Sequence, residues 1–490
     1  MSSQATKMRG LVAAAMAVVV AVLLVWPAWA QAAKPAVVTG AATENNSHSA
    51  TLHGTVDPNG LETTYQFEYG TTTEYGSKSP ALPKSIGISH VEIINGIQGL
   101  VPETTYHFRL VATNADGTTQ GEDRTFTTAS WEILSTPNPT WSVYSYLYDV
   151  SCEPSANACT SVGKGTVSGA DVPIAQRWNG SSWSEQAAAK KSGATHTRLF
   201  GVDCPSETRC LAVGNHQSAE GPSVLSEIWN EGKWNVQTTP VPPESTSSEL
   251  AAIGCNNTAE CTAVGSAVIG GVKKAIAMEW NSPTWTLQTV PIPEGAKSSQ
   301  LDGVDCNWSN FCVAVGRYTT SGSTVKSLVM FWNGEWKLHT VADPEGAVES
   351  TLLDVSCTPT PNRCTAVGSW KELGWEGANG PFTLAYRFNG VTTWTLQSTP
   401  NPTGSTASVF QDVSCATETS CTAVGSGSGS TRTLAEKWNG TSWSIQGTSN
   451  PGGFLLVSSF FGVSCRSTSC MGVGWSRNAL GDKTLAEIKK

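Results

Sequence analysis

Fourteen cysteines recur in a regular pattern, which is the clearest chemical signal in the sequence. The two members of each pair are five to seven residues apart, and a short run ending in Val-Gly follows them. Cysteines at such spacing either form a disulfide bond or bind a metal such as zinc. No histidine repeats beside the pairs and the motif is not Cys-x-x-Cys, so we predict disulfides, with neither a metal nor a redox site. The predicted pairs are Cys152–Cys159, Cys204–Cys210, Cys255–Cys261, Cys306–Cys312, Cys357–Cys364, Cys415–Cys421 and Cys465–Cys470.

A second set of reactive groups lies just before the first cysteine of several pairs. Asp149, Asp354 and Asp412 precede the Val of the pattern, whereas Asp203 and Asp305 follow it. Two carboxyl groups that face one site can act as general acid and general base in glycoside hydrolysis. The same groups can instead accept hydrogen bonds from turns or backbone near the axis of a repeat protein, and the sequence leaves both interpretations open.

Other catalytic signals are missing from the sequence. The seven histidines are scattered, and no His-Glu-x-x-His, Gly-x-Ser-x-Gly, P-loop or dinucleotide-binding motif occurs. Glu227, Glu436 and Glu487 share one position of the repeat, and we expect them to face solvent. We predict no cofactor.

Four aromatic residues outside the repeat pattern are candidate ligand contacts. Trp370 and Trp375 lie in the connection that follows Val-Gly in the fifth repeat, and Tyr318 and Trp475 occupy the same connection in the fourth and seventh. These connections are expected on one rim of the repeat domain, where aromatic rings can stack on sugars or anchor a protein. The alternative is that they pack against neighbouring loops and cover the core.

The elements that carry these residues form a repeat with a period near 50. The first cysteines of successive pairs are 52, 51, 51, 51, 58 and 50 residues apart. Each unit contains four strand-like segments: one ends at the first cysteine, one starts at the second, one runs into a Trp-Asn-Gly turn and one opens with a second tryptophan. A period near 50 with four short strands favours a β-propeller.

The two ends of the repeat complete a single unit. The seventh unit stops after the third segment, at 484–488, and residues 131–139 match 394–402 almost residue for residue. An open solenoid would need capping units instead of a unit divided between its ends. We therefore predict a seven-bladed β-propeller over residues 130–490, with its last blade closed by the strand near Trp131.

Residues 34–129 form a separate unit that is also rich in strands. Alternating segments at 50–56, 64–69 and 105–114 are separated by Gly, Pro and Asn, which predicts a β-sandwich. The run from Leu100 to Asn114, with Tyr106 in its middle, resembles the late strands of a fibronectin type III domain. That resemblance implies that the Tyr106 hydroxyl ties back to the preceding loop and that the domain acts as a spacer. The whole chain is thus predicted to be all-β.

The amino terminus and the charge balance indicate the compartment. Lys7 and Arg9 precede an apolar run, 11–26, and the small-residue pattern 28–30, which predicts a signal peptide over residues 1–30; an uncleaved membrane anchor is the alternative. We expect a secreted, extracellular protein with no membrane span in the mature chain. The net charge of -9 and the absence of a basic block exclude nucleic acid as a partner.

The chain as a whole resembles exported multidomain proteins of high-GC Gram-positive bacteria that carry cysteine-paired repeats. The resemblance brings no catalytic residues with it. We expect a non-catalytic extracellular binding or scaffold protein, in which the propeller rim recognises a glycan or a protein. The alternative is a secreted carbohydrate-active hydrolase with acidic residues at the propeller axis, which two acids about 5 to 10 Å apart in a pocket would favour.

Overall fold

The computed structural model describes residues 33–490 except 44, 81, 83–86, 88, 141, 154–157, 231, 308–310, 359–362, 375–376, 403, 428–431, 452–456 and 468. The segment predicted to be a signal peptide, 1–30, and Trp375 lie outside the described residues. Within the described part the chain is all-β: its strands form antiparallel sheets, and no helix occurs among them.

The first strands form two facing sheets. One contains β1 (Ala36–Thr39), β2 (Ser49–Asp57) and β5 (Val91–Gln98); the other contains β3 (Thr64–Gly70), β4 (Ser77–Lys78), β6 (Thr105–Asn114), β7 (Gly117–Gln120) and β8 (Arg124–Thr127). Residues alternate between buried and exposed along β2 and β5, and Leu52, Phe67 and Phe108 fill the core between the sheets. The Tyr106 hydroxyl accepts a hydrogen bond from the Val101 backbone N–H at 3.0 Å, as the sequence predicted for this tyrosine.

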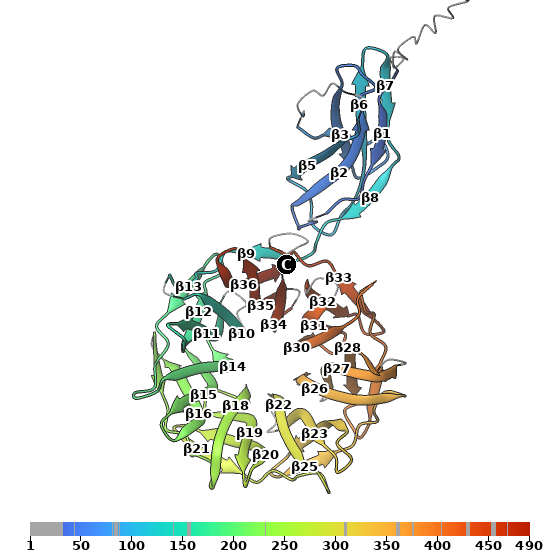
Figure 1. Ribbon diagram of the computed structural model, residues 1–490. Helices are drawn as coiled ribbons and strands as arrows, with labels where there is room; N and C mark the ends of the chain where they lie inside the picture. The colour runs from blue at the N-terminus through green and yellow to red at the C-terminus, as the bar shows by residue number, and fades with distance from the viewer. Residues whose placement is uncertain are drawn as a thin grey trace, which may run out of the picture.

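The remaining strands form seven groups of four, here called units one to seven, which surround a central axis like the blades of a propeller (Figure 1). One parallel pairing, of Val325 with Glu349, joins the fourth and fifth units into a single sheet. Units one to three are β10 (Tyr144–Cys152), β11 (Cys159–Val167), β12 (Ala170–Trp178) and β13 (Trp183–Gln186); β14 (His196–Ser206), β15 (Arg209–Ser218), β16 (Gly221–Asn230) and β17 (Lys233–Val236); β18 (Ser245–Cys255), β19 (Glu260–Ile269), β20 (Val272–Asn281) and β21 (Thr284–Gln288). Units four and five are β22 (Ser298–Asn307), β23 (Phe311–Thr319), β24 (Val325–Trp332) and β25 (Trp336–His339); β26 (Ala347–Cys357), β27 (Cys364–Gly374), β28 (Gly377–Phe388) and β29 (Trp394–Gln397). Units six and seven are β30 (Ser408–Thr417), β31 (Ser420–Gly427), β32 (Arg432–Trp438) and β33 (Trp443–Gln446); β34 (Ser458–Arg466), β35 (Ser469–Asn478), β36 (Gly481–Lys489) and β9 (Glu132–Leu134).

The outer strand of the seventh unit comes from the other end of the repeat. β9 pairs antiparallel with β36, with Leu134 opposite Ala486 and Ile133 opposite Glu487. Trp131, just before β9, is fully buried and lies against Phe460 of β34, with ring centroids 5.6 Å apart. The pairing joins residues more than 340 positions apart, so the first and last segments of the repeat share one sheet.

A bulge in the innermost strand explains the Val-Gly signature of the repeat. In every unit the register between the first and second strand shifts by one residue, for example between Leu352 and Asp354. A Cβ on Gly368, the glycine of Val-Gly in the fifth unit, would lie 2.0 Å from the backbone oxygen of Thr351. Only glycine lets the second strand pass so close to the bulge. The equivalent glycines, at 1.9 to 2.2 Å, are Gly163, Gly214, Gly265, Gly316, Gly425 and Gly474.

All seven predicted disulfides are present, each joining the first two strands of a unit. Their number indicates an oxidising environment, as is typical outside the cytoplasm. The described residues contain no helix that is long and apolar enough to cross a membrane.

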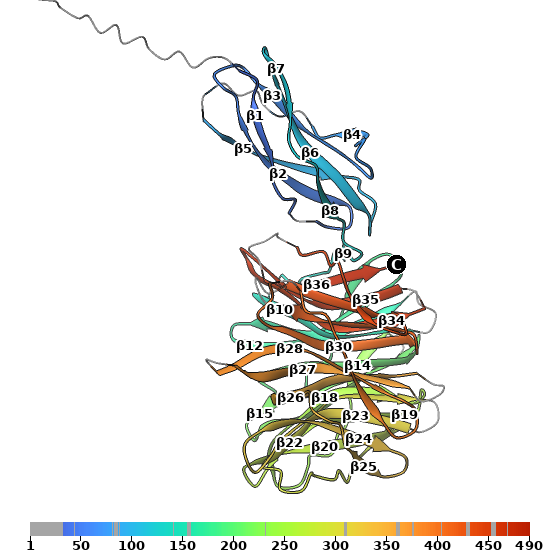
Figure 2. The same cartoon turned by 90° about the vertical axis from the view of Figure 1, so that its right-hand side faces the viewer.

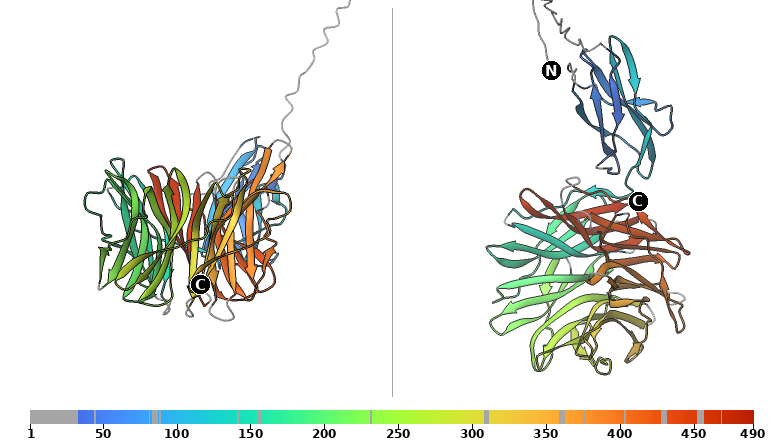
Figure 3. Two further views of the ribbon diagram at one scale, coloured as in Figure 1. Left: turned by 90° about the horizontal axis from the view of Figure 1, so that it is seen from below. Right: turned by 45° about the vertical axis from the view of Figure 1, so that its right-hand side comes forward.

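The β-sandwich lies beyond the outer edge of the seventh unit, next to β9 and β36 (Figures 2 and 3). The Ser47 backbone N–H donates to Ser449 Oγ at 3.2 Å, and Lys489 Nζ lies 2.9 Å from a carboxylate oxygen of Glu103. The sandwich therefore contacts the outer side of the ring and leaves the axis uncovered (Figure 1).

Candidate active site at the axis of the ring

The innermost strands around the axis are β10, β14, β18, β22, β26, β30 and β34 (Figure 1). The recurrent aspartates belong to five of these strands. In each unit, the bulge directs two side chains toward the next unit. One belongs to the residue before the Val of the pattern and the other to the residue after it. The five aspartates at these positions are all partly exposed and none lies at the outer surface of the ring: Asp149, Asp203, Asp305, Asp354 and Asp412.

The carboxylates before the Val hold neighbouring units together. Each accepts a hydrogen bond from the backbone N–H of the Val in the next unit. The bonds are Val202 N to Asp149 Oδ2 (2.8 Å), Val413 N to Asp354 Oδ2 (3.1 Å) and Val463 N to Asp412 Oδ2 (2.6 Å). Units that lack this aspartate have Gly or Ala there, and a Cβ on Gly462 would lie 2.7 Å from the Cα of Asp149.

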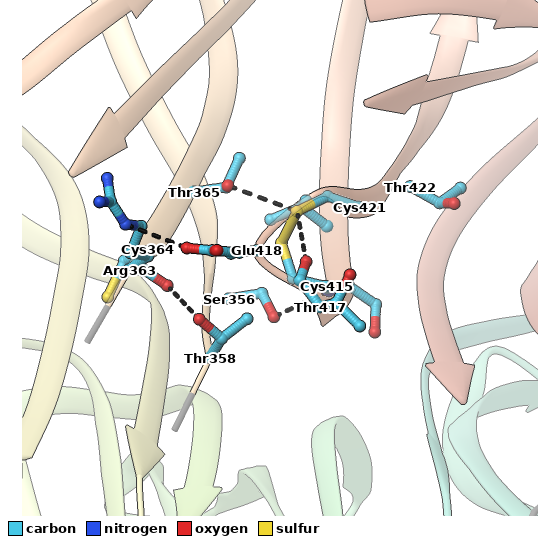
Figure 4. The surroundings of a disulfide bond; sticks show 12 residues. Ser356, Thr358, Arg363, Cys364, Thr365, Cys415, Thr417, Glu418, Cys421 and Thr422 are labelled. Atoms are coloured by element: carbon cyan, nitrogen blue, oxygen red, sulfur yellow. Dashed lines mark hydrogen bonds and ion pairs between the residues drawn. A yellow bond between two sulfur atoms is a disulfide. The ribbon is translucent and has the colours of Figure 1, made fainter. Parts of the chain in front are cut away.

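A second layer of bonds lies at the residue after the Val. The side chain at this position accepts from the backbone N–H of the first cysteine of the next unit. The acceptors and their donors are Ser151 and Cys204 (3.0 Å), Asp203 and Cys255 (2.7 Å), Asp305 and Cys357 (2.6 Å), Ser356 and Cys415 (3.1 Å), Ser414 and Cys465 (2.9 Å), and Ser464 and Cys152 (3.0 Å). Figure 4 shows the contact of Ser356 with Cys415, near the ion pair of Arg363 and Glu418. These bonds satisfy backbone amides that no strand of the same unit can reach.

Asp354 and Asp412 differ from the other acids because both accept a hydrogen bond from the same backbone N–H, that of Val413, at 3.1 and 2.6 Å. Burial raises the pKa of both groups, and the charge of Asp354 raises the pKa of Asp412 further. The pKa of Asp412 is therefore raised well above the ordinary value of an aspartate. Two acids in one low-dielectric site cannot both ionise easily, which is the arrangement that separates an acid from a base.

Two further acids near this pair titrate close to neutrality. Burial, followed by the charges of Asp354 and Asp203, raises the pKa of Asp149 to about 7. Burial, followed by the charges of Asp203 and Asp354, raises the pKa of Asp305 to about 7. The axis therefore contains protonated and ionised carboxyl groups together at neutral pH.

Aromatic side chains adjoin the acids on one side of the axis. Tyr148, the bulged residue next to Asp149, lies between Phe200 and Phe461, with ring centroids 5.6 and 5.5 Å away. Tyr146 stacks on Tyr148 at 6.3 Å. All four rings are partly exposed. We call these four residues, together with Trp475, the axial aromatic cluster.

The cluster accounts for one of the four aromatic residues singled out from the sequence. Trp475 meets Tyr146 edge to face at 5.7 Å, and the Arg477 guanidinium lies 5.4 Å from the Trp475 ring. Tyr318 packs against the core of the fourth unit, whereas Trp370 lines a cavity of the fifth. The three described candidates thus have different neighbours, and their role in ligand binding stays a prediction.

The expectation that Glu227, Glu436 and Glu487 face solvent is wrong, because all three are fully buried. They lie beneath the segment that leads out of the preceding unit. Glu227 accepts a hydrogen bond from the Ala189 backbone N–H at 2.9 Å, and Glu487 accepts one from Ser449 at 3.0 Å. The path of that segment, which the repeat spacing does not reveal, is the reason for the error.

Comparison with known proteins finds solved structures with a similar fold but no matching sequence family. No protein-family model and no curated protein sequence matches the chain. The Hadza microbial sialidase Hz136 is 7% identical over 93% of this chain and 92% of its own, with a TM-score of 0.39. Trypanosoma rangeli sialidase in complex with the inhibitor DANA is 10% identical over 77% of this chain and 57% of its own, with a TM-score of 0.41. At these values the likeness concerns the propeller-like fold and transfers no residue.

The expectation of a non-catalytic binding or scaffold protein is corrected at this point. Sialidases are among the solved structures with a similar fold, and they favour the hydrolase alternative over that expectation. Other similar structures are the sensor domain of the anti-sigma factor RsgI4 and AofleA from Arthrobotrys oligospora. The structure also places Asp354 and Asp412 near each other at the axis, where both accept a hydrogen bond from the Val413 backbone N–H.

Proposed function

We propose that the chain is a secreted carbohydrate-active hydrolase with its reaction centre at the axis of the ring. The observation that carries the proposal is the pair of Asp354 and Asp412, which share the Val413 backbone N–H, on the same ring of innermost strands as a third carboxyl group, Asp149. Hydrolysis of a glycosidic bond needs one protonated carboxyl group and one ionised carboxylate. The three aspartates supply both forms at neutral pH.

The proposed roles follow from the direction of each pKa shift. Asp412 is protonated and donates its proton to the glycosidic oxygen as the bond to the anomeric carbon breaks. The charge of Asp354 raises the pKa of Asp412 and so helps to keep it protonated. Asp149 takes a proton from the water that attacks the anomeric carbon. One water is consumed, and the proton gained by Asp149 replaces the one lost by Asp412.

The axial aromatic cluster supports a carbohydrate as the substrate. Sugar rings present flat C–H faces that stack on aromatic side chains, and Tyr148 is the chain neighbour of Asp149. Polar groups border the cluster: the Tyr146 hydroxyl donates to Asp482, and Arg198 lies 2.6 Å from Asp171. A sugar held on Tyr148 would therefore lie next to the proposed base.

The architecture proposed for this enzyme is a seven-bladed propeller closed by β9, preceded by a fibronectin type III-like spacer. The pairing of β9 with β36 and the Tyr106–Val101 bond support these two assignments. The disulfides support secretion after removal of residues 1–30, and the cysteine-paired repeat supports a bacterial origin. The extracellular partner is the glycan substrate.

The test is hydrolysis of fluorogenic 4-methylumbelliferyl glycosides, including neutral hexosides and a sialoside, by the chain without residues 1–30. We expect turnover of at least one substrate, and we expect Asp412→Asn and Asp149→Asn to lower kcat by at least 100-fold. Failure of the wild-type protein to hydrolyse any substrate of the panel would overturn the proposal.

The matched control is Asp305→Asn. Asp305 accepts a backbone N–H bond of the same kind one layer away, from Cys357, but takes no part in the Asp354–Asp412 pair. We expect this variant to keep kcat within about threefold, since an amide oxygen can still accept the bond. An equal loss in Asp305→Asn and Asp412→Asn would mean that the acids only hold the ring together.

A further inference from the structure

The fifth unit departs from the other six in one hairpin. The spacing from its first cysteine to the next is 58 residues instead of 50 to 52. Its second and third strands, β27 and β28, contain 11 and 12 residues, whereas the equivalent strands of the other units contain 7 to 10. Because the scaffold is otherwise repeated, an extension of one unit alone points to a role that the fold does not require.

A cavity of about 370 Å³ lies against this extended hairpin. Trp370 of β27, Phe382 of β28 and Leu396 of β29 give it an apolar side. The Trp370 and Phe382 rings are half-buried and 5.5 Å apart at an angle of 50°. Together they form two walls of a concave aromatic surface, of a size that suits a small ligand.

The aromatic pair is specific to this unit. Trp370 and Phe382 are partners across β27 and β28. The first and second units have Gly165 with Val172 and His216 with Ser223 at these positions, and the remaining four units have another residue with a cation. Those four pairs are Ala267 with Lys274, Tyr318 with Lys326, Gly427 with Arg432 and Ser476 with Lys483.

Polar groups complete the cavity opposite the aromatic rings. Glu372, Gln397 and Asn401 line it, and Asn401 Oδ1 accepts from the backbone N–H of Thr383 at 3.3 Å. This hydrogen bond of Asn401 is part of the repeated scaffold, because Asn450 of the sixth unit accepts the same bond from the backbone N–H of Thr433. Glu372 comes from the extended hairpin itself and gives the cavity an acidic edge.

We propose that this cavity, the fifth-unit cavity, binds one neutral sugar residue of a glycan chain, apart from the reaction centre. The Trp370 and Phe382 rings fit the C–H face of a pyranose, and the carboxylate and amides fit its hydroxyl groups. Glu372 disfavours an anionic sugar by like-charge repulsion. The inference rests on the proposed function, since the bound residue would belong to the same substrate.

The test measures binding and hydrolysis separately. Binding is measured on a microarray of neutral and sialylated oligosaccharides, and Kd by calorimetry for the strongest neutral oligosaccharide. We expect Trp370→Ala to weaken binding at least tenfold while kcat on the fluorogenic monosaccharide stays within twofold. Leu373→Ala is the matched control, because Leu373 lies on the same strand, is 75% exposed and does not line the cavity; its Kd should not change.

A second variant guards against misfolding, because Trp370 also packs against the core of the fifth unit. Leu396 is an exposed cavity residue on β29, so Leu396→Glu should fold and still weaken binding of the neutral sugar tenfold. Unchanged Kd in folded Leu396→Glu and Trp370→Ala, or binding of sialylated chains alone, would overturn the inference. Loss of hydrolysis in Asp412→Asn with unchanged Kd would instead support a separate binding site.

Discussion

Ser464 Oγ accepts a hydrogen bond from the backbone N–H of Cys152 at 3.0 Å, and so connects the seventh unit to the first. The same bond, from the side chain after the Val to the next cysteine N–H, links the sixth unit to the seventh through Ser414 and Cys465 at 2.9 Å. The contact between the ends of the repeat thus has the same chemistry as the contacts within it.

This equivalence predicts equal effects of two serine substitutions. Ser464→Ala and Ser414→Ala each leave one backbone N–H without its acceptor, which should cost about 1–2 kcal/mol of the free energy of unfolding. Thermal unfolding of the two variants should therefore show similar decreases in Tm. If the first and seventh units were not in contact, only Ser414→Ala would lower Tm.

The buried acids at the axis predict how stability depends on pH. Asp149 and Asp305 have folded-state pKa values of about 7, far above the ordinary 3.8 of an aspartate. The folded protein therefore binds these protons more tightly than the unfolded chain. Their contribution to stability is complete below about pH 4 and is lost as pH rises through 7.

We accordingly expect Tm to fall between pH 5 and pH 8 at constant ionic strength. The double variant Asp149→Asn/Asp305→Asn should show a flatter profile over the same range, since an amide does not titrate. A wild-type Tm that rises from pH 5 to pH 8 would contradict this account of the axial acids.

The same titrations predict a bell-shaped pH profile for hydrolysis. Activity needs Asp149 ionised and Asp412 protonated, so kcat should rise with pH through the pKa of Asp149, about 7, and fall again when Asp412 loses its proton. In Asp412→Asn the alkaline limb should disappear from the residual activity. A profile that is flat from pH 5 to pH 9 would exclude these two groups as acid and base.

Features carried by local spacing could be predicted from the sequence. The disulfide of Cys255 and Cys261 follows from two cysteines that flank one short turn, and the place of β9 follows from the match of 131–139 to 394–402. Each of these signals is a short string of residues that recurs with a constant period. Strand pairing within a unit depends on just such local patterns.

Contacts between units could not be predicted from the sequence in the same way. Asp354 and Asp412 are 58 residues apart and meet only because a bulge turns each strand toward its neighbour. The axial aromatic cluster also depends on the bulge, which directs Tyr148 and not Leu147 toward the axis. Sequence alone marks the recurrent aspartates as candidates, but the partner of each depends on the packing of one unit on the next.

The surroundings of Glu436 provide a final prediction. The backbone group of the preceding unit that faces Glu436 differs from the one that faces Glu227 at the same strand position. In other units the equivalent residue lies beneath the sixth residue after a tryptophan of the preceding unit. Glu227 accepts a hydrogen bond from the backbone N–H of Ala189. Gln176 donates one to the backbone oxygen of Pro137 at 2.7 Å. For Glu436 the corresponding residue is Pro400, which has no N–H. Within the described residues both carboxyl oxygens of Glu436 lack a hydrogen-bond partner, and burial raises the pKa of this group to about 8.

Glu436→Gln should therefore stabilise the protein, most strongly above pH 8. The amide cannot ionise, and it can donate to the oxygen of Pro400 as Gln176 does to that of Pro137. We expect a gain of about 1–3 kcal/mol in the free energy of unfolding at pH 9 and a smaller change at pH 5, where Glu436 is already protonated. Urea unfolding at the two pH values measures both quantities. The exposed Glu294→Gln serves as the control and should change neither, so a similar gain there would attribute the effect to net charge instead of to the buried position.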